Sequence, residues 1–242
     1  MSKLHLSRIN RGWAMRSHEH VSAAEFAEAI ASIRAGGGGS VRWFVHQPTA
    51  EEVSAATQHG LQREASLLYM RCALPLGAQH QAPADFVTRS FRPGHDNHAW
   101  LALNSRAFAA HPEQGDWTLD VLAERLAEPW FDANGFFIYE VAGAMAGFCW
   151  TKVHDHTRAH DSGHGEPEGE IFVIGVDPAH HGKGLGRALT ITGFAHLAAA
   201  GLRHGMLYVA GNNTAAIKLY ESLGMSSADG DDVFVGVVSE HA

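Results

Sequence analysis

The sequence predicts an α/β fold in which a central sheet is flanked by helices. Strand-like and helix-like segments alternate along most of the 242 residues, which is the pattern of this class. Residues 170–176 form a nearly continuous apolar run, typical of a strand that is buried on both faces. The glycine-rich loop 182–187 and a helix-like segment follow this run, so the loop is expected at a helix N-terminus.

The first part of the chain predicts two strands and two helices. Residues 1–16 show little periodicity, and no element is expected there. A helix is expected over 21–33, where apolar residues recur at helical spacing behind the capping residue Ser22. The segments that follow are the four-glycine connection 36–39, a strand over 41–46, a helix over 51–59 that ends at Gly60, a strand over 67–72 and a polar linker over 77–84.

After the linker the pattern of strands and helices starts again. Ala142-Gly143-Ala144 stands between two strand-like runs, which is typical of a hairpin. The expected elements are a strand over 86–91, helices over 98–108 and 118–126 with Thr118 as cap, strands over 135–141 and 146–153, a polar loop over 154–169, a strand over 170–176, a helix over 185–200, a strand over 205–209, a helix over 213–223 and a strand over 232–239.

Two stretches of the chain have the same order of expected elements. Residues 41–71 and 205–238 both have the order strand, helix, glycine, strand, and Gly60 and Gly224 stand in matching places. The first stretch has no counterpart of the loop 182–187. The first part is therefore interpreted as the back half of a domain of the same type as the second part.

The composition excludes several classes of protein. The content of hydrophobic residues is 45% and of charged residues 18%, which are ordinary globular values. A net charge of −8 argues against a nucleic-acid-binding protein, which usually has a basic face. Cys72 and Cys149 lie far apart in apolar surroundings, which fits a reducing cytosol. No apolar run reaches the length of a membrane span and no secretory signal is recognised, so a cytoplasmic location is expected.

The glycine-rich loop is predicted to bind a pyrophosphate group. Gly184 and Gly186 have no Cβ and let the backbone approach an anion, and the N–H groups of a helix N-terminus point at the same place. The loop is not a nucleotide triphosphate site, because Gly186 is followed by Arg187-Ala188 instead of Lys and Ser or Thr. Its glycine spacing does not match a dinucleotide-binding fingerprint either.

The loop resembles the acetyl-CoA signature of the GNAT acyltransferase superfamily. Val173–Pro178 before it and Asn213, Tyr220 and Gly224 after it stand in the order of that superfamily, and His181 stands where Gln or Arg is usual. The resemblance implies a GNAT fold, with a central mixed, twisted sheet flanked by helices, over residues 85–242. It implies a partial, truncated GNAT-like domain over residues 1–84, and acetyl-CoA as the acetyl donor.

Further blocks resemble the mycothiol synthase family. That family is actinobacterial and carries two complete GNAT-like domains. It transfers acetyl to the cysteinyl amine of cysteinyl-glucosaminyl-inositol, the last step of mycothiol biosynthesis. The blocks are Arg89–Gly94, Asn104, Ala107-Phe108, His111–Thr118, Glu128–Asp132, Gly147–His154 and Gly169-Glu170.

The resemblance implies a role for each residue of the site. Glu170 would be the general base, acting through a water, and Tyr220 the general acid for the leaving thiolate. Without the resemblance, Glu170 could be a surface glutamate at the edge of a strand and Tyr220 a tyrosine of the core, neither with a role in catalysis. The residues implied for the acceptor are Glu113, Lys152, Glu170 and Tyr208; those implied for acetyl-CoA are Ile174, Gly175 and Val176 for pantetheine, His181, Gly182, Lys183, Gly184, Leu185, Gly186 and Arg187 for the pyrophosphate, and Asn213, Thr214, Ala215, Ala216, Ile217 and Lys218 for the other side.

Two alternatives stay open at this point. One is an acyltransferase of the same fold that acts on the N-terminus of a protein or peptide, and the other is a non-catalytic protein that binds acyl-CoA. The His-rich loop 154–169 shows no fixed ligand spacing, so a solvated loop is favoured over a metal site. No metal, nucleic acid or membrane is expected as a partner, and a monomer is expected.

Overall fold

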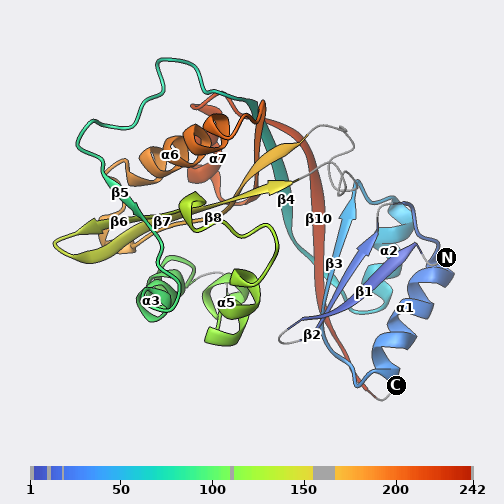
Figure 1. Cartoon of the computed structure of the whole chain (residues 1–242). Helices are drawn as coiled ribbons and strands as arrows, with labels where there is room; N and C mark the ends of the chain where they lie inside the picture. The colour runs from blue at the N-terminus through green and yellow to red at the C-terminus, as the bar shows by residue number, and fades with distance from the viewer. Residues whose placement is uncertain (1–2, 10–11, 18, 110–111, 155–166, 241–242) are drawn as a thin grey trace. The chain divides into compact units, whose positions relative to one another are not determined.

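The chain divides into two compact units (Figure 1). The computed structural model describes residues 3–9, 12–17, 19–109, 112–154 and 167–240, with 65–66, 112–113 and 228–231 described by their backbone alone. The first unit comprises Met1–Tyr69, Tyr208–Ile217 and Ser227–Ala242, and the second comprises Met70–Leu207 and Lys218–Ser226. The first unit therefore includes chain from both ends of the sequence.

The first unit is a sheet with two helices on one side (Figure 1). Its strands follow the order β1-β2-β3-β10-β4, in which β2 and β3 are parallel and β10 is antiparallel to β3. The core contains Phe26, Ile30, Trp43 and Phe234. The elements are β1 (Leu4–Ile9), β2 (Gly12–Ser17), α1 (Ala23–Ala35), β3 (Gly39–His46), α2 (Ala50–Gln58), most of β4 (Gln62–Ala73) and most of β10 (Ser226–Val238).

Both helices of this unit begin at a capping box. Ser22 accepts a hydrogen bond from the N–H of Glu25, and the carboxylate of Glu25 accepts one from the N–H of Ser22. Thr49 and Glu52 make the same pair of bonds at the start of α2. Such reciprocal bonds satisfy N–H groups that have no partner within a helix, which explains why α1 and α2 begin where they do.

The second unit contains the end of β4 and then β9, β8, β7, β6 and β5 in this order. Helix α6 covers one face of this sheet, and α3 and α5 lie on the other (Figure 1). Strand β9 (His204–Ala210) and helix α7 (Thr214–Glu221) have residues in both units. The other elements are β5 (Thr88–Ser90), α3 (Asn97–Ala107), α4 (Pro112–Gly115), α5 (Leu119–Leu126), the 3₁₀-helix η1 (Ala133–Gly135), β6 (Phe136–Val141), β7 (Ala144–His154), β8 (Glu168–Val176), the 3₁₀-helix η3 (Pro178–His180) and α6 (Leu185–Ala199).

An aromatic core fills the space between this sheet and helices α3 and α5. Trp100 of α3 lies edge-on to Phe136 and Phe148, and Phe136 stacks on Trp150 at a centroid distance of 4.5 Å. All four side chains are fully buried. Offset and edge-on contacts of this kind stabilise a pair of rings beyond the area that they bury.

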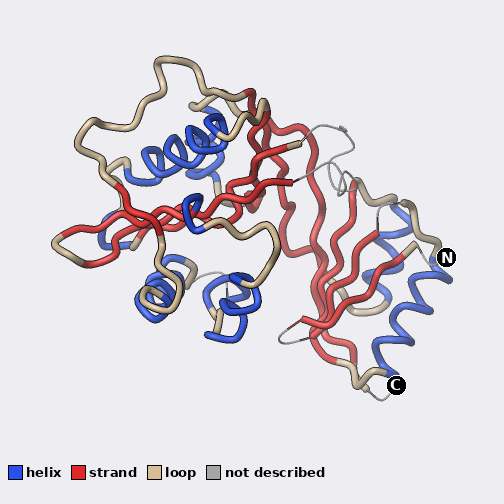
Figure 2. The backbone as a smooth tube through the Cα atoms, in the orientation of Figure 1, coloured by secondary structure: helices blue, strands red, loops and turns tan. Residues whose placement is uncertain are grey.

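Most of the expected elements are confirmed. The helices over 21–33, 51–59, 98–108, 118–126, 185–200 and 213–223 and the strands over 41–46, 135–141, 146–153, 170–176 and 205–209 appear within a few residues of their expected ends. Residues 74–87 form a loop that includes the expected linker (Figure 2). The expected α/β class is therefore confirmed.

Several expectations about the elements are wrong in part. Residues 4–9 and 12–17 form β1 and β2 instead of irregular chain, and β5 is shorter than the strand expected over 86–91. Strands β4 and β10 are much longer than expected, because each continues through polar residues that a short apolar pattern does not cover. Both ends of the loop expected over 154–169 belong to strands, since His154 ends β7 and Glu168 begins β8. The expected domain limits, 1–84 and 85–242, stay a prediction.

The length and hydropathy of the helices can be compared with what a membrane span requires. Within the described part of the chain, no helix is both long enough and apolar enough to cross a bilayer.

Gly193 lets α6 pack closely on β7, and this contact makes a testable prediction. A Cβ at Gly193 would lie 2.7 Å from Sγ of the buried Cys149, whereas a Cβ at Gly186 would lie 3.6 Å from Leu219, an ordinary contact. Both glycines are in α6, so alanine raises helix propensity at each. We expect Gly193→Ala to be less stable than Gly186→Ala by about 1–3 kcal/mol, because overpacking strains the core. Urea unfolding measures the difference, and equal midpoints for the two variants would contradict the packing.

Candidate functional site

Strand β8 is paired on both sides at its start and on one side at its end. Its parallel pairing with β9 joins Gly169 to Gly205 and Glu170 to Met206. Its antiparallel pairing with β7 continues to Val176, which lies opposite Gly147. Among the described residues, the edge of β8 beyond Glu170 therefore has no paired strand on the β9 side. A strand edge of this kind can bind an extended ligand through main-chain hydrogen bonds.

A bulge interrupts the pairing of β8 with β7 at Phe172. Ile171 lies opposite Thr151 and Val173 lies opposite Trp150, so Phe172 has no opposite residue. A bulge of this type places one extra residue on one strand and bends it.

The extra residue reverses the alternation of side chains along β8. A Cβ at Gly169 would meet Leu197 of α6, whereas a Cβ at Gly175 would meet Ala107 of α3, although the two glycines are an even number of residues apart. Without the bulge at Phe172 they would point to the same face. Neighbouring residues of a strand point to opposite faces. Gly169 faces α6, so the side chain of Glu170 points to the face that α3 and α5 cover.

Glu170 forms a cluster of charged groups with two residues of β7. Its Oε2 lies 2.7 Å from Nε2 of His154 and 3.7 Å from Nζ of Lys152. Lys152 is directly opposite Glu170 in the antiparallel register, and His154 is two residues further on the same face. The side chains of Lys152 and His154 are each 18% exposed and that of Glu170 is 9% exposed. The cluster is therefore largely shielded from water, and charges interact more strongly in such a shielded site than in water.

Two aromatic rings hold the ammonium group of Lys152. Its Nζ lies 5.1 Å from the ring centroid of Trp130 and 5.4 Å from that of Phe172. The two rings meet nearly edge to face at 4.9 Å. A cation over an aromatic face is attracted by the ring quadrupole. The position of Lys152 is thus set by Glu170 on one side and by these rings on the other.

A second buried carboxylate lies on the same strand. Glu168 is two residues before Glu170 and forms an ion pair with Arg71, at 2.6 Å between Oε1 and Nε. Buried carboxylates need such a partner, because an unpaired buried charge is costly. Glu168 therefore has its own cation, distinct from the groups around Glu170.

The glycine-rich loop ends at an open helix N-terminus. Gly182 and Gly184 have φ values of +74° and +76°, in the left-handed region that favours glycine. Gly184 is the N-cap of α6 and provides no side-chain cap. A Cβ on either glycine would have no protein atom within 4 Å, so the space beside the loop is open. Open space at uncapped N–H groups suits a phosphate group.

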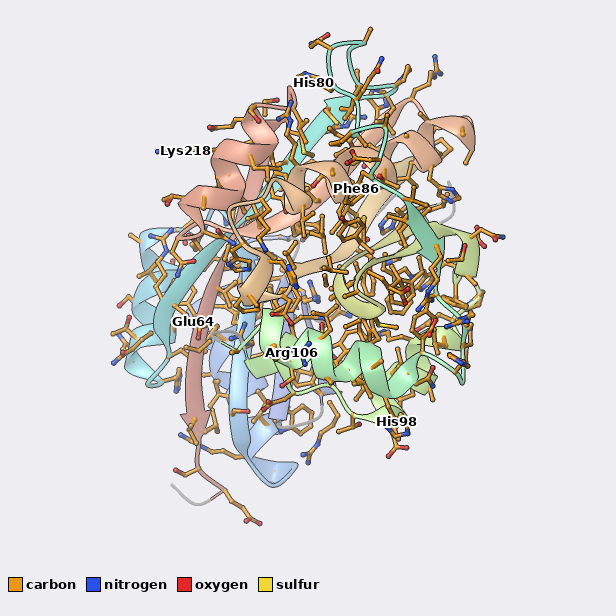
Figure 3. All side chains as sticks on the ribbon, turned by 90° about the vertical axis from the view of Figure 1, so that its left-hand side faces the viewer. Glu64, His80, Phe86, His98, Arg106 and Lys218 are labelled. Atoms are coloured by element: carbon orange, nitrogen blue, oxygen red, sulfur yellow. The ribbon has the colours of Figure 1, made fainter. Side chains whose placement is uncertain are left out.

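Side chains around this loop are held by hydrogen bonds. Nε2–H of His181 donates to the carbonyl of Val176 at 3.1 Å. Arg187 donates to the hydroxyl of Ser222 at 2.7 Å and to Nδ1 of His80 at 3.0 Å, and Figure 3 labels His80 on the loop between β4 and β5. Because a carbonyl only accepts, the bonded nitrogen of His181 carries the proton. A neutral His181 has no second N–H to offer an anion, unlike the Gln or Arg that is usual at this place.

A hydrogen bond from α3 holds the chain just before the glycine-rich loop. Arg106, labelled near the end of α3 in Figure 3, donates to Asp177 at 2.8 Å. Asp177 also accepts from the N–H of Ala179 at 3.0 Å. These bonds tie the chain that leaves β8 to the helix on that side of the sheet.

Tyr220 is a buried phenol in α7. Burial raises its pKa well above the usual range, and the charge of a Cys149 thiolate would raise it further. Among the described residues, the Tyr220 hydroxyl has no hydrogen-bond partner within the chain. A phenol with a raised pKa stays protonated at neutral pH, so it can donate a proton or a hydrogen bond but does not act as a base.

The other expected site residues are described to different extents. Tyr208 lies on β9, in the first unit, and its ring lies 5.6 Å from that of Tyr69. Asn213–Ile217 belong to the first unit as well, and the carboxamide of Asn213 accepts from the N–H of Ala216 at 3.2 Å. Lys218 is exposed on α7 in the second unit. Glu113 lies in α4, and its side chain is outside the described residues.

His154 is the residue of this site that the sequence interpretation did not assign. It was grouped with the polar loop 154–169, whereas it is the last residue of β7. The signal that could have found it is the spacing Lys152-Val153-His154, since alternate residues of a strand share a face. Most of the loop, residues 155–166, lies outside the described residues. Among the residues that the structure describes, no group of three or more His, Cys, Asp or Glu side chains could hold a metal ion.

Comparison with known proteins gives one family and one group of relatives. The model of the "Acetyltransferase (GNAT) family" matches residues 97–225. A "Mycothiol acetyltransferase" of Thermobispora bispora is 49% identical over 199 residues, and one of Acidothermus cellulolyticus is 47% identical over 212 residues. The matches cover 81% and 85% of this chain and 66% and 64% of the relatives. The chain thus spans a little under two thirds of the length of these relatives.

The solved structures that resemble this chain have the expected fold. A GCN5-related N-acetyltransferase from Sphaerobacter thermophilus aligns with a TM-score of 0.68 at 18% identity, over 98% of this chain and 77% of that one. A tandem GNAT protein from the clavulanic acid biosynthesis pathway aligns with a TM-score of 0.63 at 14% identity, over 98% and 78%. The GNAT fold expected from the sequence is therefore confirmed.

The raised pKa of Tyr220 predicts how stability falls in alkali. Above about pH 10 the phenol ionises in the unfolded chain but stays protonated in the folded one, so the free energy of unfolding falls as pH rises. Tyr220→Phe should remove this part of the fall, up to about 1.4 kcal/mol per pH unit, and leave the slope below pH 9 unchanged. Tyr208→Phe, at an exposed position, is the control. Urea unfolding from pH 8 to 11 measures both, and identical slopes for the wild type and Tyr220→Phe would contradict the burial of this phenol.

Proposed function

Because the chain belongs to the acetyltransferase (GNAT) family, we propose that it transfers acetyl from acetyl-CoA to the cysteinyl amine of cysteinyl-glucosaminyl-inositol. The two relatives described above, 49% and 47% identical over the matched residues, are each named "Mycothiol acetyltransferase". The observation that carries the proposal is the Glu170–Lys152–His154 cluster, which lies where the parallel pairing of β8 ends.

The acceptor fits the charges of this cluster. Its cysteinyl group carries an α-ammonium, which the carboxylate of Glu170 attracts, and its sugar and cyclitol rings carry hydroxyl groups. Lys152 lies 3.7 Å from Glu170, beyond hydrogen-bond length, so its ammonium protons are available to hydroxyl or carbonyl oxygens of the acceptor. Glu113 and Tyr208 are assigned to the acceptor by resemblance alone.

The donor fits the open edge of β8 and the loop that follows. Main-chain groups of Ile174–Val176 would pair with the amides of pantetheine, as an added strand does. The N–H groups at the start of α6 would bind the pyrophosphate, since the space beside Gly182 and Gly184 is open. His181 through Arg187 and Asn213 through Lys218 are the further residues proposed for acetyl-CoA.

The reaction is a direct transfer of acetyl between sulfur and nitrogen. The neutral amine attacks the thioester carbonyl, the C–N bond forms and the C–S bond breaks. Glu170 accepts the proton that the amine nitrogen loses, through a water. Tyr220 donates a proton to the leaving thiolate of coenzyme A. An α-amine has a pKa near 8, so a sizeable share of the acceptor is already neutral at physiological pH.

A direct assay tests the proposal. Purified protein is incubated with acetyl-CoA and the cysteinyl-sugar, and the released thiol of coenzyme A is measured together with the mass of the acetylated product. A product 42 mass units heavier than the acceptor supports the proposal. Acetylation of peptide N-termini in preference to the cysteinyl-sugar would favour the peptide acetyltransferase alternative, and acetyl-CoA binding without transfer to either would favour a binding protein.

Replacement of the proposed base separates catalysis from donor binding. Glu170→Gln keeps the shape of the side chain but accepts no proton, so we expect kcat to fall about 10²–10⁴-fold, the range of general-base catalysis. The Kd of acetyl-CoA should change little, because Glu170 is not among the residues proposed for the donor. Glu124→Gln on the exposed face of α5 is the matched control. A loss of acetyl-CoA affinity as large as the loss of kcat would show that the role is assigned wrongly.

Replacement of a loop glycine tests the donor site. Gly184→Ala adds a methyl group where the backbone would approach the pyrophosphate, so we expect acetyl-CoA affinity to fall at least tenfold. Gly201, at the other end of α6, has a similar φ of +88° and equally open surroundings. Gly201→Ala should therefore cost a similar amount of stability, about 1 kcal/mol, and leave affinity unchanged. Calorimetric titration measures both variants, and equal affinities would place the donor elsewhere.

A further inference from the structure

We propose that His154 is a positioning residue for Glu170: its Nε2–H holds one carboxylate oxygen, Oε2, and so directs the other, Oε1, to the water through which the acceptor amine loses its proton. The inference rests on the proposed function for the role of Glu170 as base. The contact on which it depends is independent of that function.

The geometry determines which nitrogen of His154 carries the proton. Nε2 of His154 and Oε2 of Glu170 are 2.7 Å apart, a short hydrogen bond. An ionised carboxylate only accepts, so Nε2 must donate. Neutral His154 is therefore the Nε2–H tautomer, and the bond is charge-assisted on the acceptor side, which makes it one of the stronger kinds.

Lys152 and His154 both lie beside the same carboxylate oxygen of Glu170. Lys152 is 3.7 Å from Oε2, the oxygen that His154 also contacts. Among the described residues, Oε1 has no partner within the chain. A carboxylate held at one oxygen cannot rotate freely, so the position of Oε1 is set by His154 and Lys152 together. Oε1 is the oxygen left to accept a proton.

Glu168 does not compete for the His154 proton. It lies opposite His154 in the β7–β8 register, and a carboxylate there could draw the imidazole away from Glu170. Its Oε1 is paired with Arg71 at 2.6 Å instead. Among the described residues, Arg71 thus pairs with Glu168, whereas Lys152 and His154 lie beside Glu170.

Two substitutions of His154 separate donation from bulk. His154→Gln keeps an N–H near the place of Nε2, and His154→Leu keeps the size without a donor. We expect His154→Leu to lower kcat about 10–100-fold with an unchanged KM for acetyl-CoA. His154→Gln should recover most of kcat. His98→Leu, at an exposed position of α3 (Figure 3), is the matched control.

A measurement without turnover tests the contact itself. The ¹⁵N signals of the imidazole distinguish the two neutral tautomers, and we expect His154 to be the Nε2–H form in the wild type and to change in Glu170→Gln. An Nδ1–H tautomer, or signals indifferent to Glu170→Gln, would overturn the inference whether or not the protein acetylates the cysteinyl-sugar. Equal kcat for His154→Leu and the wild type, in an active enzyme, would overturn it as well.

Discussion

Strand β8 has one residue more than its partner between Ile171 and Val173, and the arrangement of the site depends on that insertion. Before Phe172 the even-numbered residues face α3 and α5, and after it the odd-numbered ones do. The bulge therefore lets one strand present Glu170 to the aromatic side of the sheet and still continue as a buried strand with Val173 and Gly175 on that side. In a regular strand Val173 and Gly175 would point to the face opposite to that of Glu170.

The two residues proposed for proton transfer have different surroundings. Glu170 lies next to the ammonium of Lys152 and the imidazole N–H of His154. Tyr220 is buried near the thiol of Cys149, and burial favours its neutral form. An acid must be protonated when a cycle of acetyl transfer begins. The surroundings of Tyr220 thus match the role proposed for it.

Much of the fold could be predicted from apolar periodicity, because most helices and central strands here bury a regular face. The capping residue Ser22 and the glycines after α2, α6 and α7 mark element ends by local chemistry alone. Strands β1 and β2 were not predicted, because they are strands by virtue of their pairing: β1 pairs with β2, and β2 pairs with β3. Glu170 and Lys152 came from resemblance, whereas the role of His154 depends on cross-strand register, and periodicity carries no information on register. The bulge at Phe172 was not predicted for the same reason.

Strand β10 pairs with β3 along eight residues, although most of the chain lies between them. On the ribosome, residues 39–46 leave the exit tunnel long before residues 226–238 are translated. Until then β3 exposes an edge with unpaired main-chain groups on the side that β10 will cover, and such edges invite association with other chains. The sheet of the first unit must therefore stay open at this edge until β10 has been translated.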